Sequence, residues 1–191
     1  VKNYFHFLGD AAWRVKNVKG AIQIAKLAHQ KLRVVGGVRF NFNQGIRLSF
    51  DTHVRFDGMQ GGEQKNEIIK YSKGFIFPVR WHEPFGLALI ESLYFGCPVF
   101  GTPYGSLPEI VIPEVGYLTT TASALELADA VGSVNDFNRK KCHEYVMENF
   151  THIQMTASYL SLYEKVLNGE KLNPKAPILQ SIQYEKFLPF N

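Results

Sequence analysis

The sequence is poor in the residues that build metal, redox and disulfide centres. Its 191 residues include only two cysteines, Cys97 and Cys142, which form no Cys-x-x-Cys pair. The six histidines are scattered without an i, i+4 pair, and no Asp-x-Asp occurs. These absences argue against a zinc site, a dithiol redox motif and a carboxylate site for Mg²⁺ or Mn²⁺, so we expect neither a metal nor a cofactor. With so few cysteines, a reduced, cytoplasmic setting is the simpler expectation.

Long apolar runs and clustered positive charge are also missing. No stretch approaches the length needed to span a bilayer. The net charge is +4 and the pI is near 9.0, but the lysines and arginines are spread along the chain. We therefore expect no nucleic-acid partner, because that function gathers basic residues on one element. The absence of Gly-x-Gly-x-x-Gly argues against a nicotinamide or flavin site.

What the chain does contain is a repeated order of short apolar runs and helical segments. Hydrophobic residues make up 46% of it, enough for the full core of one domain. The pattern predicts βαβ units and hence an α/β, Rossmann-like parallel sheet with helices on both faces. The expected strands are Tyr4–Leu8, Lys31–Val35, His53–Phe56, Gly74–Val79, Cys97–Phe100 and Val115–Thr119. The expected helices are Gly20–Gln30, Gln64–Ser72, Leu87–Gly96, Ser123–Val134, Asp136–Asn149 and Ile153–Asn168.

The C-terminal part of the chain changes character. The last expected helix carries an aromatic and apolar stripe that we expect to pack into the core. The stripe consists of Met155, Tyr159, Leu162, Tyr163 and Val166. We predict a domain over residues 1–170 and a tail over 171–191, which has no period but contains apolar residues that need a surface. These are Ile178, Leu179, Tyr184, Phe187 and Phe190.

The stretch from Gly74 to Glu109 holds the candidate site. Its strand is followed by a turn with Glu83, and Gly86 precedes a helix that begins at Leu87. In parallel sheets, ligands bind beyond the carboxyl ends of the strands, where helix N-termini offer free N–H groups and partial positive charge. This turn therefore predicts a site for a phosphate or diphosphate, bound by Phe85, Gly86 and Leu87.

A second carboxylate lies one turn inside the same helix. Glu91 is too far from the turn to share a phosphate but is placed to accept hydrogen bonds from hydroxyls. Two neighbouring ribose hydroxyls would each gain about 1.5–3 kcal/mol from such a charge-assisted bond in the absence of water. The combination points to a nucleotide sugar.

The order of motifs around the two glutamates resembles the signature of retaining glycosyltransferases of family 4, which have the GT-B fold. Seven residues separate Glu83 from Glu91, and Gly96-Cys97-Pro98-Val99 and Gly105-Ser106-Leu107-Pro108-Glu109 follow. The resemblance implies a domain that binds a nucleotide diphosphate sugar without metal and takes part in sugar transfer with retention of configuration.

A GT-B enzyme consists of two such domains with the active site between them. The resemblance therefore implies an acceptor-binding N-terminal domain outside this chain, without which the chain would be inactive. It also implies that the tail docks on that domain and that any membrane association runs through it.

The resemblance further assigns a basic pair that would bind the diphosphate. Lys19, which precedes Gly20, matches the second member of the pair. Relatives carry an arginine shortly after the first strand, where this chain has Asp10. The partner of Lys19 is therefore Arg14 or Lys16, or it is absent.

The remaining roles concern the sugar and the base. By resemblance, Glu83 would hold the hydroxyls of the donor sugar, and Gly105 and Ser106 would shape the wall beside it. His82 would either contact the donor or stack on Trp81. Two loop residues, Met59 and Gln60, are either base contacts or plain loop residues.

Two other functions stay open at this point. One is a non-catalytic nucleotide-sugar-binding module, which the departure at Asp10 makes conceivable. The other is a different GT-B enzyme, such as an epimerase or a phosphorylase. The acceptor would be a glycan, a lipid or a small molecule, and the residues do not select the base or the sugar of the donor.

Overall fold

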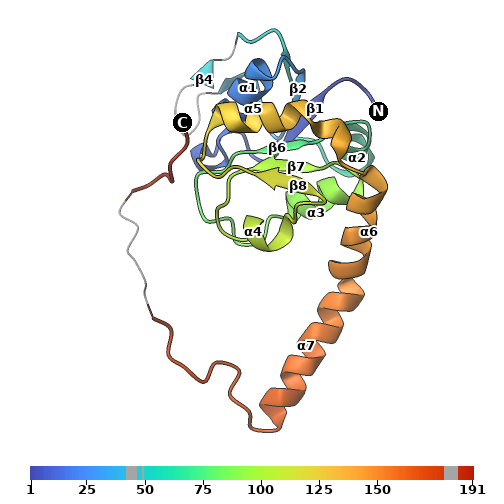
Figure 1. Ribbon diagram of the computed structural model, residues 1–191, viewed down its shortest axis with the longest axis vertical. Helices are drawn as coiled ribbons and strands as arrows, with labels where there is room; N and C mark the ends of the chain where they lie inside the picture. Colours follow the sequence, from blue (N-terminus) through green and yellow to red (C-terminus); the bar gives the residue numbers. More distant parts are fainter. Residues whose placement is uncertain (42–46, 49, 179–184) are drawn as a thin grey trace.

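A parallel sheet covered by helices on both faces forms the body of the protein (Figure 1). The computed structural model describes residues 1–41, 47–48, 50–178 and 185–191. The six strands of the sheet have the order β5-β2-β1-β6-β7-β8, and all neighbours are parallel. They are Phe5–Leu8 (β1), Leu32–Val35 (β2), Val54–Gly58 (β5), Phe75–Phe77 (β6), Val99–Gly101 (β7) and Gly116–Leu118 (β8). The order reverses between β1 and β6, which is where doubly wound sheets bind ligands.

Helices follow the strands as the sequence predicts. They are Val18–Leu27 (α1), Gly62–Lys70 (α2), Leu87–Tyr94 (α3), Leu107–Ile110 (α4), Ala124–Gly132 (α5), Arg139–Asn149 (α6) and His152–Leu167 (α7), with 3₁₀ turns at Arg14–Lys16 (η1) and Val134–Asp136 (η2). The predicted class is confirmed. The start of α1 differs from the expected Gly20, because the Asn17 side chain accepts a hydrogen bond from the Gly20 N–H at 3.1 Å and so caps a helix that begins at Val18.

The segment between β2 and β5 contains two further short strands. Its two strands, Phe40–Asn41 (β3) and Arg47–Leu48 (β4), pair antiparallel, apart from the main sheet. The site edge therefore stays in the six parallel strands.

Two hydrophobic clusters fill the space between the sheet and its two helical layers. Side chains of β1 and of Tyr4 just before it alternate between the two clusters. Phe5 and Phe7 pack under α1 and α5, whereas Tyr4 and Leu8 face the layer of α2, α3, α4 and α6. This alternation is the period of a strand buried on both faces. Figure 1 shows α1 and α5 together on one side of the sheet and α3 and α4 on the other.

One polar network crosses the second layer. His6 is fully buried, and its ring nitrogens lie 2.9 Å from the hydroxyls of Ser72 and Ser92. Burial lowers the pKa of His6 to about 3, so the ring is neutral near pH 7. These hydrogen bonds connect β1 to α3 and to the segment after α2, so the role of His6 is structural.

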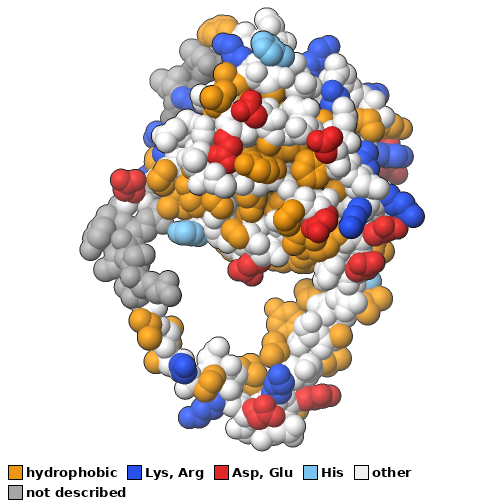
Figure 2. All heavy atoms as spheres, viewed as in Figure 1, with side chains coloured by type: hydrophobic (Ala, Val, Ile, Leu, Met, Phe, Trp, Pro, Cys, Tyr) orange, Lys and Arg blue, Asp and Glu red, His pale blue; other side chains and the backbone are white. Residues whose placement is uncertain are grey.

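The stripe on α7 does not pack into the core, contrary to the expectation from its spacing. No residue of this helix is buried, and the five stripe residues keep 39–59% of their surface exposed. The helix is capped by Thr151 and extends away from the sheet (Figure 1), so its apolar side meets solvent. Hydrophobic side chains are visible along it in Figure 2. Among the described helices, none is long and apolar enough to cross a bilayer.

The end of the tail packs on this domain. Leu179 and Tyr184 lie outside the described residues, but Phe190 joins the cluster under α1 and α5. Leu188 and Arg80 exchange two hydrogen bonds, from the Leu188 N–H to the Arg80 carbonyl at 2.9 Å and from Arg80 Nε to the Leu188 carbonyl at 2.8 Å. Docking of the whole segment 171–191 on another domain stays a prediction, but its last residues already have a surface here.

Candidate functional site

The predicted wall of the site is assembled from two loops at the carboxyl edge of the sheet. Glu83 after β6 and Gly105 after β7 form an isolated parallel bridge. The Ser106 N–H donates to the Glu83 carbonyl and the Ser106 hydroxyl donates to the Phe85 carbonyl, both at 2.9 Å. Gly105 has φ +67°, and a Cβ there would lie 2.3 Å from the Glu83 backbone. The close contact of the loops therefore requires glycine, and it sets the position of Glu83.

The Glu83 carboxylate is buried, and one of its two oxygens accepts hydrogen bonds from the protein. The residue is 6% exposed, and its Oε2 accepts hydrogen bonds from Lys16 Nζ at 2.6 Å and from Trp81 Nε1 at 2.9 Å. Lys16 Nζ also lies 4.9 Å from the centre of the Trp81 ring. Within the described residues, Oε1 receives no hydrogen bond. One oxygen is thus fixed by the protein, while the other keeps its capacity to accept from a ligand.

Sequence reasoning did not find this use of Lys16. It named Lys16 only as one possible partner of Lys19, because a lysine in a loop gives no signal of its contact across the sheet edge. The structure places Lys16 in η1, at the turn between β1 and α1, directly against Glu83. Trp81 carried no expected polar role, yet its indole is the second donor.

The other basic candidates are exposed. Lys19 lies on the first turn of α1 and, like Arg14 of η1, makes no side-chain hydrogen bond or ion pair within the described part of the chain. Asp10 stands where the predicted resemblance implies an arginine, and its side chain accepts a hydrogen bond from the Ala12 N–H at 2.8 Å. Its carboxylate therefore stabilises the local turn.

The N-terminus of α3 has no side-chain cap among the residues that the structure describes. Gly86, at the N-cap, has φ +81°, and no described side chain accepts from the first N–H groups of the helix. Phe85 and Leu87, on either side of Gly86, are exposed. The partial positive charge of this helix end therefore opens at the same edge as Glu83, as the sequence predicts.

Glu91 has a different environment. Its carboxylate forms an ion pair with Lys65 of α2, and its side chain is 41% exposed. Glu91 also lines a cavity of about 490 Å³ between α3, α6 and α7, whose other lining residues are mostly apolar. The described contacts do not join Glu91 to the cluster around Glu83.

His82 does not stack on Trp81, which was one of its two predicted roles. Its ring lies edge-on to Tyr104, with centroids 6.4 Å apart, while Trp81 meets Trp13 at 6.2 Å. The exposed His82 keeps the other expected role, donor contact, as a prediction.

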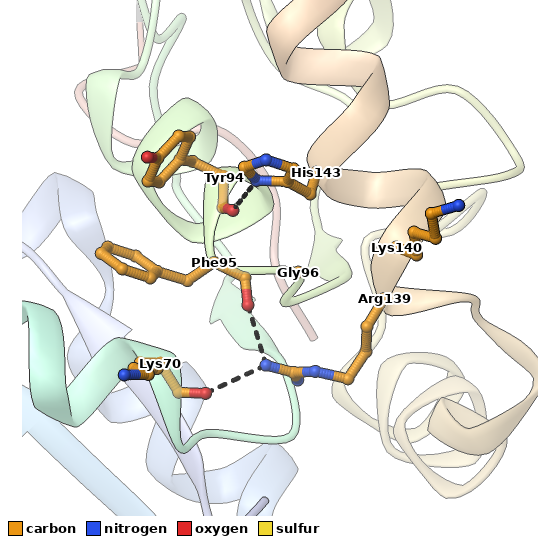
Figure 3. A pocket seen from close by; sticks show the side chains of 7 residues that line it. All are labelled: Lys70, Tyr94, Phe95, Gly96, Arg139, Lys140 and His143. Carbon is orange, nitrogen blue, oxygen red and sulfur yellow. Dashed lines mark hydrogen bonds between the residues drawn. The ribbon is translucent and has the colours of Figure 1, made fainter.

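A second, basic pocket lies away from these residues. It has a volume of about 420 Å³ between α2, α3 and α6 (Figure 3). Arg139 donates hydrogen bonds to the carbonyls of Lys70 at 3.1 Å, Ser72 at 2.7 Å and Phe95 at 2.8 Å. These carbonyls lie at or after the ends of α2 and α3, so the guanidinium serves as a cap for two helices. The N–H donors of Arg139 are therefore engaged in hydrogen bonds within the protein.

The titratable groups offer no metal centre in the described ranges. No group of three or more His, Cys, Asp or Glu residues there could hold a metal ion. Burial raises the pKa of Cys97 to about 11 and that of Cys142 to about 11, so both thiols are protonated near pH 7. The polar groups that remain at the edge are a carboxylate, exposed cations and helix amides.

The fold and the motif around Glu83 define a Rossmann-like domain of the kind that forms half of a GT-B glycosyltransferase. A glycosyltransferase involved in avilamycin A biosynthesis aligns with a TM-score of 0.71 and 19% identity, over 88% of this chain and 52% of that one. Sucrose-phosphate synthase from Thermosynechococcus elongatus aligns with a TM-score of 0.70 and 22% identity, over 88% of this chain and 47% of that one.

The sequence places the domain in a family. Residues 2–148 match the family Glycosyl transferases group 1, and the chain belongs to that family, which confirms the predicted resemblance. N-acetyl-alpha-D-glucosaminyl L-malate synthase of Bacillus anthracis is 28% identical over 171 residues, which are 83% of this chain and 44% of that protein. The chain thus spans less than half the length of this relative.

Proposed function

We propose that this chain is the donor-binding domain of a retaining glycosyltransferase, which transfers a sugar from a nucleotide diphosphate sugar to an acceptor. The observation that carries the proposal is the Glu83 carboxylate, fixed through Oε2 by Lys16 and Trp81 beside the uncapped N-terminus of α3. Family membership supports it. So does the likeness to a pneumococcal O-GlcNAc transferase solved with UDP and GlcNAc, with a TM-score of 0.63 and 15% identity over 86% of this chain and 36% of that one.

The roles in donor binding follow from which basic side chains already bind another residue of the protein. Lys16 holds Glu83, so the diphosphate falls to Lys19, Arg14 and the amides at the start of α3. Departure of the nucleotide builds negative charge on the diphosphate, and cations and helix amides stabilise that charge more in the transition state than in the ground state. No metal ion is needed for this stabilisation.

Glu83 orients the sugar in this proposal. Its Oε1 accepts hydrogen bonds from sugar hydroxyls while Lys16 and Trp81 keep the carboxylate in place. Glu91 binds the ribose, and donor binding replaces or shares its contact with Lys65. The acceptor then attacks from the face that the nucleotide leaves, so that the configuration is retained.

The test is a calorimetric titration of this chain with UDP, GDP and ADP and their sugars. We expect binding of one nucleotide class, weakened about tenfold or more in Glu91→Gln through loss of a charge-assisted hydrogen bond. Glu144→Gln is the matched control, because Glu144 also pairs with a lysine, Lys140, but on the surface of α6. Equal binding by Glu91→Gln and Glu144→Gln would reject the ribose role.

The rival function is a nucleotide-sugar-binding module without catalysis. Asp10 favours it, because the usual arginine of the first loop is replaced by a carboxylate that serves a turn. The two functions differ in the whole protein: a module binds the donor but does not release the nucleoside diphosphate with any acceptor. Release of the diphosphate that depends on Glu83 would reject the module.

A further inference from the structure

The last described residues cross the carboxyl edge of the sheet, beside the candidate site. The Tyr104 hydroxyl, after β7, donates to the Pro189 carbonyl at 2.9 Å. Beyond β8, the Asn191 N–H donates to the Ala122 carbonyl at 2.9 Å and the Ala124 N–H donates to the Asn191 carbonyl at 2.6 Å. Together with the two Leu188–Arg80 hydrogen bonds, residues 185–191 contact the loops that follow β6, β7 and β8. We call residues 185–191 the terminal strap.

The terminal strap is anchored in the fold by Phe190. Its ring packs into the cluster under α1, and a Cβ at Gly20 would lie 2.7 Å from Cε1 of that ring. The same Cβ would lie 2.4 Å from Asn17 Nδ2. A glycine at position 20 therefore leaves room for both the aromatic ring and the helix cap. Because the strap shares the core of the domain, it is a fixed part of this edge.

Phe187 of the strap contacts two arginines. The guanidinium carbon of Arg14 is 5.0 Å from the centre of its ring, and that of Arg80 is 5.3 Å away. Arg80 also donates from Nε to the Leu188 carbonyl. Arg14, by contrast, makes no side-chain hydrogen bond within the described part of the chain. Its guanidinium contacts the Phe187 ring.

A cation–π contact can hold an arginine in place and still leave it able to bind an anion. The ring interacts with the guanidinium as a charge, whereas the N–H donors can still form hydrogen bonds. An arginine held in this way loses less conformational freedom when a phosphate binds than one that moves freely in solvent. Arg14 therefore combines a fixed position with unused donors at the carboxyl edge.

We propose that Phe187 is a positioning residue, which holds Arg14 so that its guanidinium donates to the diphosphate of the nucleotide. This inference rests on the proposed function and adds the terminal strap to the donor site. Donor binding by this domain then depends on a residue that lies more than a hundred positions after Glu83 in the sequence. Because Phe187 acts only through Arg14, the ring and the arginine contribute to the same interaction with the diphosphate and not to two separate ones.

A double-mutant cycle on this chain tests the proposal. We expect Phe187→Leu and Arg14→Gln each to weaken binding of the preferred nucleoside diphosphate about three- to tenfold, and the double variant to lose no more than either single variant. Phe187→Tyr, which keeps an aromatic ring, is the matched control and should bind like the parent. Binding of the uncharged nucleoside, followed by NMR shifts, should be unchanged in all variants.

The possible results separate this inference from the function on which it rests. Additive losses, a Phe187→Leu protein that binds the diphosphate as well as the parent, or an equal loss for the nucleoside would each overturn the role of Phe187 and leave the donor site standing. If the unchanged chain binds no nucleotide, the proposed function fails and this inference fails with it. Unfolding midpoints of the variants show whether any loss comes from a damaged fold.

Discussion

Glu83 and Glu91 are the same residue type on neighbouring elements, each paired with a lysine from another part of the chain, and yet they differ in burial. The Glu83 side chain is 8% exposed, and its partner Lys16 lies beside the Trp81 and Phe77 rings. The Glu91 side chain is 41% exposed and pairs with Lys65 across two surface helices. The difference teaches that one carboxylate is held by the fold before any ligand arrives, whereas the other remains accessible to solvent and ligand.

The largest effect should come from Glu83 itself. In the whole protein, we expect Glu83→Gln to lower turnover by about a hundredfold or more, because the sugar would lose the group that orients it. Turnover is measured as release of the nucleoside diphosphate from the preferred donor. Near-normal turnover in a folded Glu83→Gln protein would reject the positioning role.

Removal of the two lysines compares the two pairs directly. Lys16→Met should lower the free energy of unfolding by about 3 kcal/mol, because it leaves the buried Glu83 charge without its cation. Lys65→Met should cost less than about 1 kcal/mol, since the pair is partly exposed. Urea denaturation of this chain measures both. Similar costs for the two substitutions would contradict the contrast in burial.

The loop contact that buries Glu83 can be broken without touching either charge. Gly105→Ala should cost at least about 2 kcal/mol of folding free energy, because the residue has positive φ and its Cβ would overlap the Glu83 backbone. Gly132→Ala at the end of α5 is the control, since no atom lies within 4 Å of a Cβ there. We expect the control to be neutral, as measured by thermal unfolding. An equally stable Gly105→Ala protein would show that the loop can relax.

A third carboxylate, that of Glu126, belongs to a partly buried residue. Burial alone would raise the pKa of Glu126, but hydrogen bonds from the Thr119 hydroxyl, the Thr120 N–H, the Thr121 hydroxyl and the Tyr117 hydroxyl lower it well below 4.5. Because the pKa is lower in the folded protein, Glu126 stabilises the fold above pH 4.5, and this contribution is lost as the pH falls further.

The effect of Glu126 should be the smallest of the set. We expect Glu126→Gln to lower stability by about 1–2 kcal/mol at pH 7 and by less near pH 2. Urea denaturation at a series of pH values measures the difference. A cost that does not change with pH would show that the charge of Glu126 is not what its hydroxyl partners stabilise.

The sequence by itself determined the strands, the order of elements and the motif around the two glutamates. Apolar runs such as Phe75–Phe77 are typical of buried strands, and Gly86 and Gly105 mark turns that other residues do not adopt easily. Local patterns of this kind have a direct physical cause, so residue spacing was enough to predict that the loops holding Glu83 and Gly105 follow parallel strands at one edge of the sheet.

Only the tertiary structure decided which distant groups meet. The pairing of Lys16 with Glu83 spans 67 positions and that of Phe187 with Arg14 spans 173, and no periodicity encodes such contacts. The apolar stripe of α7 shows in another way that the sequence does not reveal tertiary contacts. Spacing fixes a helix and its apolar face, but whether that face is covered depends on where the neighbouring elements end, and here the helix leaves the sheet.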